Sequence, residues 1–598
     1  RRLPMEKDKK GVWVKTAHGD LNGVYYTYEI RHDDITEETI DIYARTAGVN
    51  GAMGMVIDLE ETNPAGWHNY HPEPLEHYTD AVIYEMHVRD FSIDKSGNFC
   101  YKGRFLAFVE KGVINAAGDK IGIDHLKELG VTHVHLMPSF DYQTVDETRL
   151  NVPQFNWGYD PQNFNCPEGS YSTNPYDGRA RVAEFKRLVH ALHCQGIRVI
   201  MDVVYNHTYA TADSPFNKIF NKYYYRLWGE NGEYFSNGSG CGNEIATERF
   251  MVRKYIIDSL VYWATEYKID GFRFDLMGLY DIETMNKIDE TLHAINPDII
   301  LYGEGWIGGD SPLADSKRAM KLNARHTPNI AFFSDDFRDT IKGNNFENRS
   351  RGYVNGATGS EEYVKEVMCG RIPHPQIPNL TKFAWTLSPC QTVNYVEAHD
   401  NLTLWDKLIY TNPTDSLDTR KKMDKMAAAC VFLAQGIPFI QAGQDFLRSK
   451  PLPGGAYDHN SYNSPDAVNS LKWDRKSEFR DVFDYYKGLI EFRKAHSALR
   501  MFTAEDIGRN MKFFDHLPQR IVGFGLYGDC ELEEIIVFFN PTNDDITLHA
   551  FGEYNVYIDG DNAGNKPLYT VCDDYIIKPH STMVMGRPYP QPEEEAAE

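Results

Sequence analysis

The residues best suited to chemistry are two carboxylates, each at the polar end of a strand-like run. In the run IDGFRFDLMG, which begins at Ile269, side-chain alternation places Arg273 and Asp275 on the same face. A neighbouring positive charge lowers the pKa of an aspartate, so Asp275 should be ionised and could act as a nucleophile. The structural alternative is an Arg–Asp pair that only caps the strand.

The second carboxylate is Glu304, in the run IILYGEGW that begins at Ile299. The glycines on either side of it would let a substrate approach closely. The apolar and aromatic neighbours, Tyr302 and Trp306, would raise the pKa of Glu304, as a general acid requires at neutral pH. The structural alternative is an ordinary solvated glutamate at the end of a strand.

Polar residues also end two other strand-like runs: Asp202, Asn206, His207, His399, Asp400 and Asn401. The carboxylate of Asp400 could stabilise positive charge in a transition state, and the histidines could donate hydrogen bonds to substrate hydroxyls. One such histidine alone would more often be a packing residue. Convergence from separate strand ends favours a shared site, and no His-x-x-x-His or similar zinc spacing is present.

The elements that carry these residues alternate between strand-like and helix-like segments. Apolar runs with polar ends are separated by segments with helical apolar spacing. Eight such units predict an α/β fold, a (β/α)8 TIM barrel whose active site forms where the carboxyl ends of the strands meet. The eight runs begin at Ala81, Val131, Ile197, Ile269, Ile299, Ile330, Thr392 and Ile437.

Shorter β-like segments flank the barrel. We expect a partial N-terminal β-sandwich over residues 1–62, a catalytic barrel with loop insertions over 63–500 and a C-terminal β-sandwich over 501–598. Two insertions rich in Tyr, Asn and Gly, from Phe140 to about Asp177 and from Thr208 to about Glu248, should shape a substrate cleft. The acidic end, EEEAAE, is predicted to be disordered.

The composition disfavours several classes of protein. A net charge of −24 disfavours binding to nucleic acid, which draws its affinity from clustered Lys and Arg. No apolar run approaches the roughly 18 residues that a membrane span needs, so no membrane partner is expected. The 9 cysteines form no C-x-x-C pair. A neutral sugar polymer is compatible with this charge, and an aromatic content of 13% suits stacking on sugar rings.

The sequence leaves the cellular location open. The chain begins at Arg1 with neither an initiator Met nor a signal peptide, so we expect a fragment or a processed product. Both the bacterial cytoplasm and secretion stay open, and we expect a monomer.

Four segments resemble the ordered sequence regions of the α-amylase superfamily: DVVYNH from Asp202, DGFRFD from Asp270, GEGW from Gly303 and NYVEAHDN from Asn394. The resemblance implies a retaining glycoside hydrolase. In such an enzyme Asp275 would attack the anomeric carbon, Glu304 would serve as acid and base, and Asp400 would stabilise the transition state. The resemblance also implies the residues that line the subsite of the reacting glucose: His207, Arg273 and His399.

Another segment, FNWGYDP from Phe155, resembles the YNWGYDP signature of type I pullulanases, and its only departure is Phe155, which keeps the ring. The resemblance implies that Tyr159 stacks beneath the reacting glucose. It adds five further substrate-binding residues: Trp157, Asp160, Met277, Trp306 and Asn401. Of these, Met277 and Trp306 would lie near the subsites for the branch of the glucan. The N-terminal stretch is similar to the second half of the starch-binding-like β-sandwich that precedes the barrel in pullulanases.

These observations predict an enzyme that debranches starch or glycogen by retaining hydrolysis of α-1,6-glucosidic linkages in pullulan, amylopectin and limit dextrins. Isoamylase-like and bifunctional amylopullulanase activities stay open, as do a glucan branching transglycosidase and a non-catalytic glucan-binding protein. No cofactor is required for the chemistry. The resemblance suggests a structural calcium ion, although no D-x-[DN]-x-[DN]-G loop is present.

Overall fold

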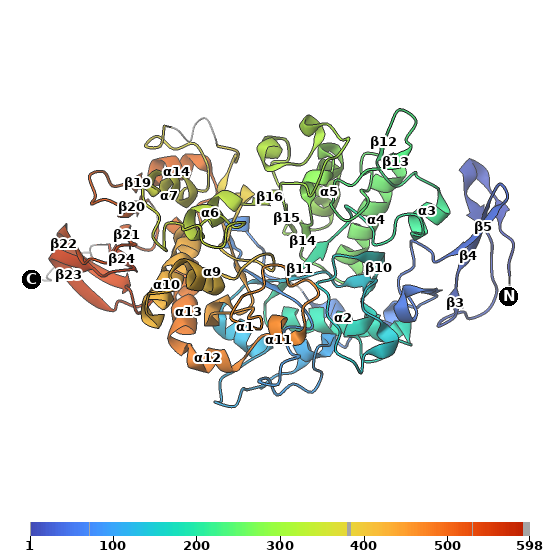
Figure 1. Ribbon diagram of the computed structural model, residues 1–598, viewed down its shortest axis with the longest axis horizontal. Helices are drawn as coiled ribbons and strands as arrows, with labels where there is room; N and C mark the ends of the chain where they lie inside the picture. The colour runs from blue at the N-terminus through green and yellow to red at the C-terminus, as the bar shows by residue number, and fades with distance from the viewer. Residues whose placement is uncertain (1, 71, 379–383, 529, 590–598) are drawn as a thin grey trace, which may run out of the picture.

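A closed barrel of eight parallel strands forms the centre of the molecule (Figure 1). The computed structural model describes residues 2–70, 72–378, 384–528 and 530–589. Each barrel strand lies within one of the runs expected from the sequence, so the predicted barrel is confirmed. The barrel strands are β7 (Ile83–Met86), β8 (His133–Leu136), β11 (Arg198–Val203), β14 (Gly271–Phe274), β15 (Ile300–Gly303), β16 (Ala331–Phe333), β17 (Thr392–Asn394) and β18 (Ile437–Gln441).

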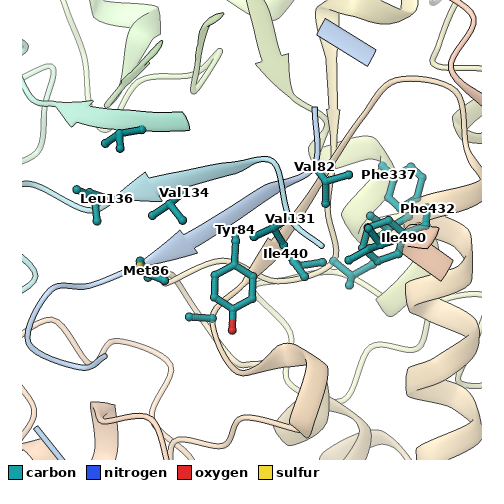
Figure 2. Packing of buried hydrophobic residues seen from close by; sticks show 14 of the residues in the cluster. Val82, Tyr84, Met86, Val131, Val134, Leu136, Phe337, Phe432, Ile440 and Ile490 are labelled. Carbon is teal, nitrogen blue, oxygen red and sulfur yellow. The ribbon is translucent and has the colours of Figure 1, made fainter. Parts of the chain in front are cut away.

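Successive residues of the barrel strands face opposite sides of the barrel wall, as strand geometry requires. On β7, Ile83 packs into a cluster inside the barrel, whereas Tyr84 and Met86 belong to the larger core outside it. Figure 2 shows this outer core, where strand residues meet Phe432 and Ile490 from the surrounding helices. Residues in phase with Ile83 therefore point into the barrel.

Helices cover the outer face of the barrel (Figure 1). Side-chain caps start several of them, as where Asp177 accepts a hydrogen bond from the Arg179 N–H at the start of α2. The α-helices are α1 (Ile123–Leu129), α2 (Gly178–His193), α3 (Pro215–Ile219), α4 (Phe250–Glu266), α5 (Ile282–Ile295), α6 (Asp335–Lys342), α7 (Glu361–Met368), α9 (Leu404–Thr411), α10 (Leu417–Leu433), α11 (Asp466–Asn469), α12 (Asp474–Glu478), α13 (Arg480–Ala495) and α14 (Ala504–Asn510).

The connection from β15 to β16 departs from a regular strand–helix unit. Its helical turns are two 3-10 helices, η10 (Asp315–Lys317) and η11 (Lys321–His326). The connecting segment contains glycines and prolines that disfavour a continuous α-helix. The general-acid candidate Glu304 therefore leads into a loop rather than a long helix.

Both expected insertions contain short antiparallel strand pairs. After β8, β9 (Phe140–Tyr142) pairs with β10 (Pro161–Pro167). After β11, β12 (Leu227–Trp228) pairs with β13 (Tyr234–Phe235) as a hairpin. These pairs give the insertions a fixed shape on the side of the barrel where the strands end.

The flanking β regions lie at opposite ends of the molecule (Figure 1). The N-terminal region consists of three antiparallel pairs, built from β1 (Glu6–Lys7), β2 (Trp13–Val14), β3 (Tyr25–Tyr26), β4 (Tyr28–His32), β5 (Ile35–Thr39) and β6 (Gly54–Met55). The exact domain boundaries stay a prediction. The acidic tail that we expected to be disordered lies outside the described residues.

The C-terminal strands form one six-stranded antiparallel sheet in the order β19-β20-β21-β24-β22-β23. The long strand β22 pairs with both β23 and β24, and its register shifts along both ladders. Such irregularities bend a strand. The bent β22 pairs with strands on both of its sides, so the strands form one continuous sheet, whereas a sandwich would divide them between two sheets. The strands are β19 (Met511–Phe513), β20 (Val522–Tyr527), β21 (Glu534–Asn540), β22 (Ile546–Ile558), β23 (Tyr569–Ile577) and β24 (Ser581–Arg587). Among the described helices, none combines the length and apolarity needed to cross a membrane.

Candidate active site

One buried arginine joins three carboxylates at the mouth of the barrel. Arg273 lies on β14, and its Nη1 donates hydrogen bonds to Asp202 at 3.0 Å and to Asp275 at 2.9 Å. Its Nη2 donates to Glu304 at 2.6 Å. Asp202 lies on β11 and Glu304 directly follows β15, so three adjacent strands supply the cluster. The structure thus brings together the predicted nucleophile and the predicted general acid.

Glu304 lies in an environment that keeps its carboxyl group protonated. Burial raises the pKa of Glu304 to about 8; Arg273 opposes the rise, and Asp275 and Asp400 add to it. The Leu276 N–H, which also opposes the rise, donates to Glu304 Oε2 at 2.9 Å from a residue in the left-handed backbone region, with φ of 40°. A carboxyl with this pKa holds its proton at pH 7 and can therefore act as an acid.

The glycines beside Glu304 are required by the protein's own packing. A Cβ atom on Gly303 would lie 2.5 Å from the carbonyl oxygen of Phe274, and one on Gly305 would lie 2.6 Å from the backbone nitrogen of Lys321. Close approach of a substrate, the reason expected from the sequence, stays a prediction, and the close neighbouring backbone is a reason that lies within the protein itself.

The predicted pKa direction of Asp275 is wrong. Burial raises the pKa of Asp275 above its ordinary value; Arg273 lowers it, and the charge of Asp202 adds to the rise. The expected net lowering fails because burial disfavours the charged form of Asp275, and the nearby charge of Asp202 adds to this effect. Asn206 Nδ2 donates to Asp275 Oδ2 at 2.8 Å and so fixes the orientation of the carboxylate.

Asp202 has the most hydrogen-bond donors of the three carboxylates. In addition to Arg273, the Tyr159 hydroxyl donates to Asp202 Oδ2 at 2.7 Å, and His135 Nε2 lies 3.1 Å from the same oxygen. Burial opposes ionisation, but Arg273, His135 and Tyr159 hold the pKa of Asp202 below its ordinary value. Asp202 therefore carries a negative charge that balances Arg273.

A second buried ion pair positions the third predicted catalytic carboxylate, Asp400. Glu85 of β7 accepts hydrogen bonds from the backbone N–H and the ring Nδ1 of His399, each at 2.7 Å. Burial lowers the pKa of His399, but Glu85 and Asp400 outweigh it and raise the pKa to about 9. His399 is therefore a cation at pH 7, with Nε2 3.8 Å from Asp400 Oδ1. The Asp400 side chain is 56% exposed, which makes it more exposed than Asp275 or Glu304.

Aromatic rings from the loop before β10 enclose His399. The Tyr159 ring stacks on the imidazole with centroids 5.0 Å apart, and Trp157 meets it edge-on at 4.8 Å. His207 Nε2 lies 3.0 Å from the backbone oxygen of Tyr159, and burial lowers the pKa of His207, so this imidazole is neutral. The signature loop and the strand ends thus form one connected arrangement.

Four of the expected substrate-binding side chains contact the protein itself. Met277 is fully buried in η9 (Met277–Leu279), and Trp306 packs against the cluster inside the barrel. Asp160 Oδ2 accepts from the Thr144 N–H at 2.7 Å. The side chain of Asn401 accepts a hydrogen bond from Asn345. Met277 in particular offers no surface to a substrate, because the chain segment after β14 turns its side chain towards Gly303.

Glu85, His135 and Lys450 also belong to the site, although they were not predicted from the sequence. Glu85 is in phase with Ile83, so strand alternation could have found it. Lys450 Nζ donates to the backbone oxygens of His399 at 2.6 Å and Asn401 at 2.9 Å. It comes from a loop with no strand pattern, so nothing in the sequence pointed to it.

A second arginine-centred cluster lies away from this site. Asp141, Glu147 and Glu168 lie close enough together that they could hold a metal ion. However, Arg181 donates to Asp141 at 2.9 Å and to Glu147 at 2.8 Å, and both Glu168 oxygens accept from backbone N–H groups. Calcium needs about six to eight oxygen ligands. These occupied carboxylates fit the guanidinium better than they fit a calcium ion.

Comparison with known proteins places this site in a family. Residues 99–225 match the model of the α-amylase catalytic domain. The chain is 40% identical to a pullulanase of Bacillus subtilis over 556 residues, which cover 91% of this chain and 74% of that protein.

Solved structures agree with the sequence match. The pullulanase from Bacillus acidopullulyticus superposes with a TM-score of 0.92 at 42% identity, covering 98% of this chain and 70% of that one. A pullulanase from Paenibacillus barengoltzii in complex with maltohexaose and α-cyclodextrin superposes with a TM-score of 0.91 at 41% identity. The match covers 98% of this chain and 89% of that one.

The eight-stranded barrel, with paired carboxylates at its strand ends, defines a glycoside hydrolase of the α-amylase superfamily. Within that superfamily, the chain belongs to the pullulanase family. It is a starch-debranching enzyme of the pullulanase type.

Proposed function

We propose that the enzyme hydrolyses α-1,6-glucosidic linkages in pullulan, amylopectin and branched limit dextrins with retention of anomeric configuration. The observation that carries the proposal is the bridge made by Arg273, which donates to Asp275 at 2.9 Å and to Glu304 at 2.6 Å. One guanidinium bonded to both carboxyl groups favours the short separation of retaining enzymes, about 5–5.5 Å, over the roughly 6.5–9.5 Å of inverting ones.

The first step breaks the glycosidic bond. Asp275 attacks the anomeric carbon while Glu304, protonated because its pKa is about 8, donates its proton to the leaving glycosidic oxygen. A glycosyl ester on Asp275 and a released glucan chain result. In the second step the Glu304 carboxylate takes a proton from water, the resulting hydroxide attacks the same carbon, and Asp275 is freed.

The surrounding residues bind the reacting glucose. Tyr159 presents a ring for stacking on the sugar, and His399, a cation through its pairing with Glu85, donates hydrogen bonds to sugar hydroxyls. Asp400, which is exposed, accepts from hydroxyls and favours the positive charge of an oxocarbenium-like transition state. No step of this reaction is assigned to a metal or cofactor.

Product analysis tests the proposal against its neighbours. Maltotriose from pullulan, with no products from unbranched amylose, is the expected result. Release of chains from glycogen without attack on pullulan would indicate an isoamylase-like enzyme, and maltose or glucose from amylose would indicate an amylopullulanase. A rise in branch points would indicate a transglycosidase, and binding without products a non-catalytic protein.

A further inference from the structure

The hairpin in the insertion after β11 carries an unusual pair of exposed aromatic side chains. Trp228 of β12 lies directly opposite Tyr234 of β13 in the strand register. Their exposed fractions are 42% and 71%. Within the part of the chain that the structure describes, neither side chain has a hydrogen bond or a ring contact. Large aromatic groups exposed together in this way are typical of binding surfaces.

The base of this hairpin is fixed by buried contacts. The Arg226 N–H donates to Glu244 O, and the Ser236 N–H donates to Arg226 O, each at 2.9 Å. The Arg226 side chain is buried, and its Nε donates to Glu248 at 3.0 Å. Near the tip, Lys222 Nζ donates to Gly232 O at 3.0 Å. The backbone that carries the aromatic pair is therefore held in place, which limits the backbone entropy that binding would cost.

The segment that follows the hairpin is hydrogen-bonded to both sides of the active site. Gly238 O accepts from the N–H groups of Gly308 at 3.0 Å and Gly309 at 2.8 Å, in the loop that begins at Glu304. The Ile245 N–H donates to the backbone oxygen of Asn206 at 2.8 Å, and Asn206 orients the nucleophile. The hairpin is thus structurally continuous with the catalytic strand ends.

We propose that Trp228 and Tyr234 form a second binding platform, on which a glucan chain stacks while one of its branch points occupies the active site. The proposal rests on the proposed function, because that function supplies the α-glucan. A neutral polymer of glucose offers apolar ring faces to both side chains without a charge penalty. A second copy of this chain is disfavoured as the occupant, since each copy carries a net charge of −24.

Binding is tested first without catalysis. The full-length double variant Trp228→Ala/Tyr234→Ala and the parent protein are run in native gels that contain soluble starch, and dissociation constants are taken from the retardation. We expect binding to weaken about two- to tenfold, the range for loss of an aromatic contact. The double variant Trp228→Phe/Tyr234→Phe should retain most of the affinity, because stacking needs rings and not polar groups.

Tyr569→Ala is the matched control, since Tyr569 is 44% exposed on β23 at the far end of the molecule (Figure 1). It should bind starch like the parent. Equal retardation of the parent, the alanine pair and Tyr569→Ala would overturn the platform. This binding result holds even if pullulan is not hydrolysed, so a failure of the proposed function is distinguishable from a failure of the platform.

Kinetics separate the platform from damage to the catalytic loop. For the alanine pair, KM on high-molecular-weight branched starch should rise about two- to tenfold while kcat and activity on a short branched oligosaccharide stay unchanged. An equal loss of kcat on both substrates would mean that the hairpin only supports the loop after Glu304, and would overturn the proposal. Dimerisation of the parent that is lost in the alanine pair would assign the surface to a second copy and overturn it as well.

Discussion

Two clusters in this protein share one composition, an arginine among three carboxylates, but differ in what they can do. Arg273 bonds Asp202, Asp275 and Glu304 at the ends of barrel strands. Arg181 of α2 bonds carboxylates in the insertion after β8. The side chains of Asp275 and Glu304 keep 12% and 8% of their surface exposed, whereas those around Arg181 are sealed at 0–2%.

The difference shows that burial and shifted pKa values do not by themselves make an active site. Burial also raises the pKa of Asp141, to about 7, close to the value of Glu304. The cluster around Arg273 differs because solvent reaches Asp275 and Glu304, although Asp202 is sealed, and because Tyr159, His399 and Asp400 lie beside it. The sealed cluster is suited to a contribution to stability, because its carboxylates pair with Arg181 away from solvent.

The largest expected effect is on kcat, and replacing a carboxylate by an amide should produce it in the cluster around Arg273 but not in the cluster around Arg181. Asp275→Asn and Glu304→Gln should each lower kcat on pullulan by at least about a thousandfold, because a nucleophile or an acid is lost while binding contacts remain. Asp141→Asn should leave kcat per folded molecule within about twofold of the parent. Steady-state kinetics on purified, folded protein measures all three.

Activity above roughly a thousandth of the parent in Asp275→Asn or Glu304→Gln would contradict the assigned roles. Affinity for soluble starch in native gels should stay near the parent value in both variants. A variant that loses binding and activity together would point to structural damage rather than lost chemistry.

The next largest effect concerns stability. Arg181→Met should lower the free energy of unfolding by about 3–5 kcal/mol, because buried carboxylates lose their counter-charge. The loss should be greatest at alkaline pH and smaller near pH 5, where raised pKa values let Asp141 and Glu147 take up protons. Chemical denaturation at several pH values measures this.

Arg179→Met on the same helix is the control. Its side chain is 52% exposed and pairs with Asp177 on the surface, so the change should have little effect on the free energy of unfolding. Equal destabilisation by the two substitutions would mean that the sealed cluster makes no special contribution to stability.

A smaller effect is expected in the pH dependence of catalysis. In the proposed mechanism the acid form of Glu304 donates the proton, and burial raises its pKa to about 8, so kcat/KM should fall above that pH. Asp400 helps to raise this pKa, so Asp400→Asn should move the alkaline limb to lower pH as well as reduce kcat. Initial rates measured between pH 5 and 10 locate the alkaline limb in the parent and in Asp400→Asn. A constant kcat/KM up to pH 10 in protein that stays folded would contradict the role of Glu304.

Strand patterns in the sequence predicted most of the barrel and much of the site. Alternation along the run from Ile269 to Asp275 placed Arg273 and Asp275 on one face, and the structure has them 2.9 Å apart. The eight apolar runs predicted eight strands for the same reason. Local periodicity is sufficient here because a barrel gathers its strand ends at one face.

Properties that depend on several distant residues could not be predicted. The pKa of Asp275 is raised first by burial and then by the charge of Asp202, and local sequence patterns show neither effect. Lys450 reaches His399 from a loop without periodicity. The cluster around Arg181 brings together three carboxylates from separate positions in one insertion and an arginine from α2. Candidate ligands for the suggested calcium ion could therefore not be named from the sequence.

The smallest expected effect returns to that cluster. Because Arg181 and backbone N–H groups already occupy its carboxylate oxygens, we expect excess EDTA to change the midpoint of thermal unfolding by less than about 1 °C. Differential scanning calorimetry of the full chain, with and without EDTA, measures the shift. A lower midpoint that added calcium restores would show a structural ion. The same experiment on Asp141→Asn would then locate it, since an ion held by this cluster would bind more weakly when one carboxylate is lost.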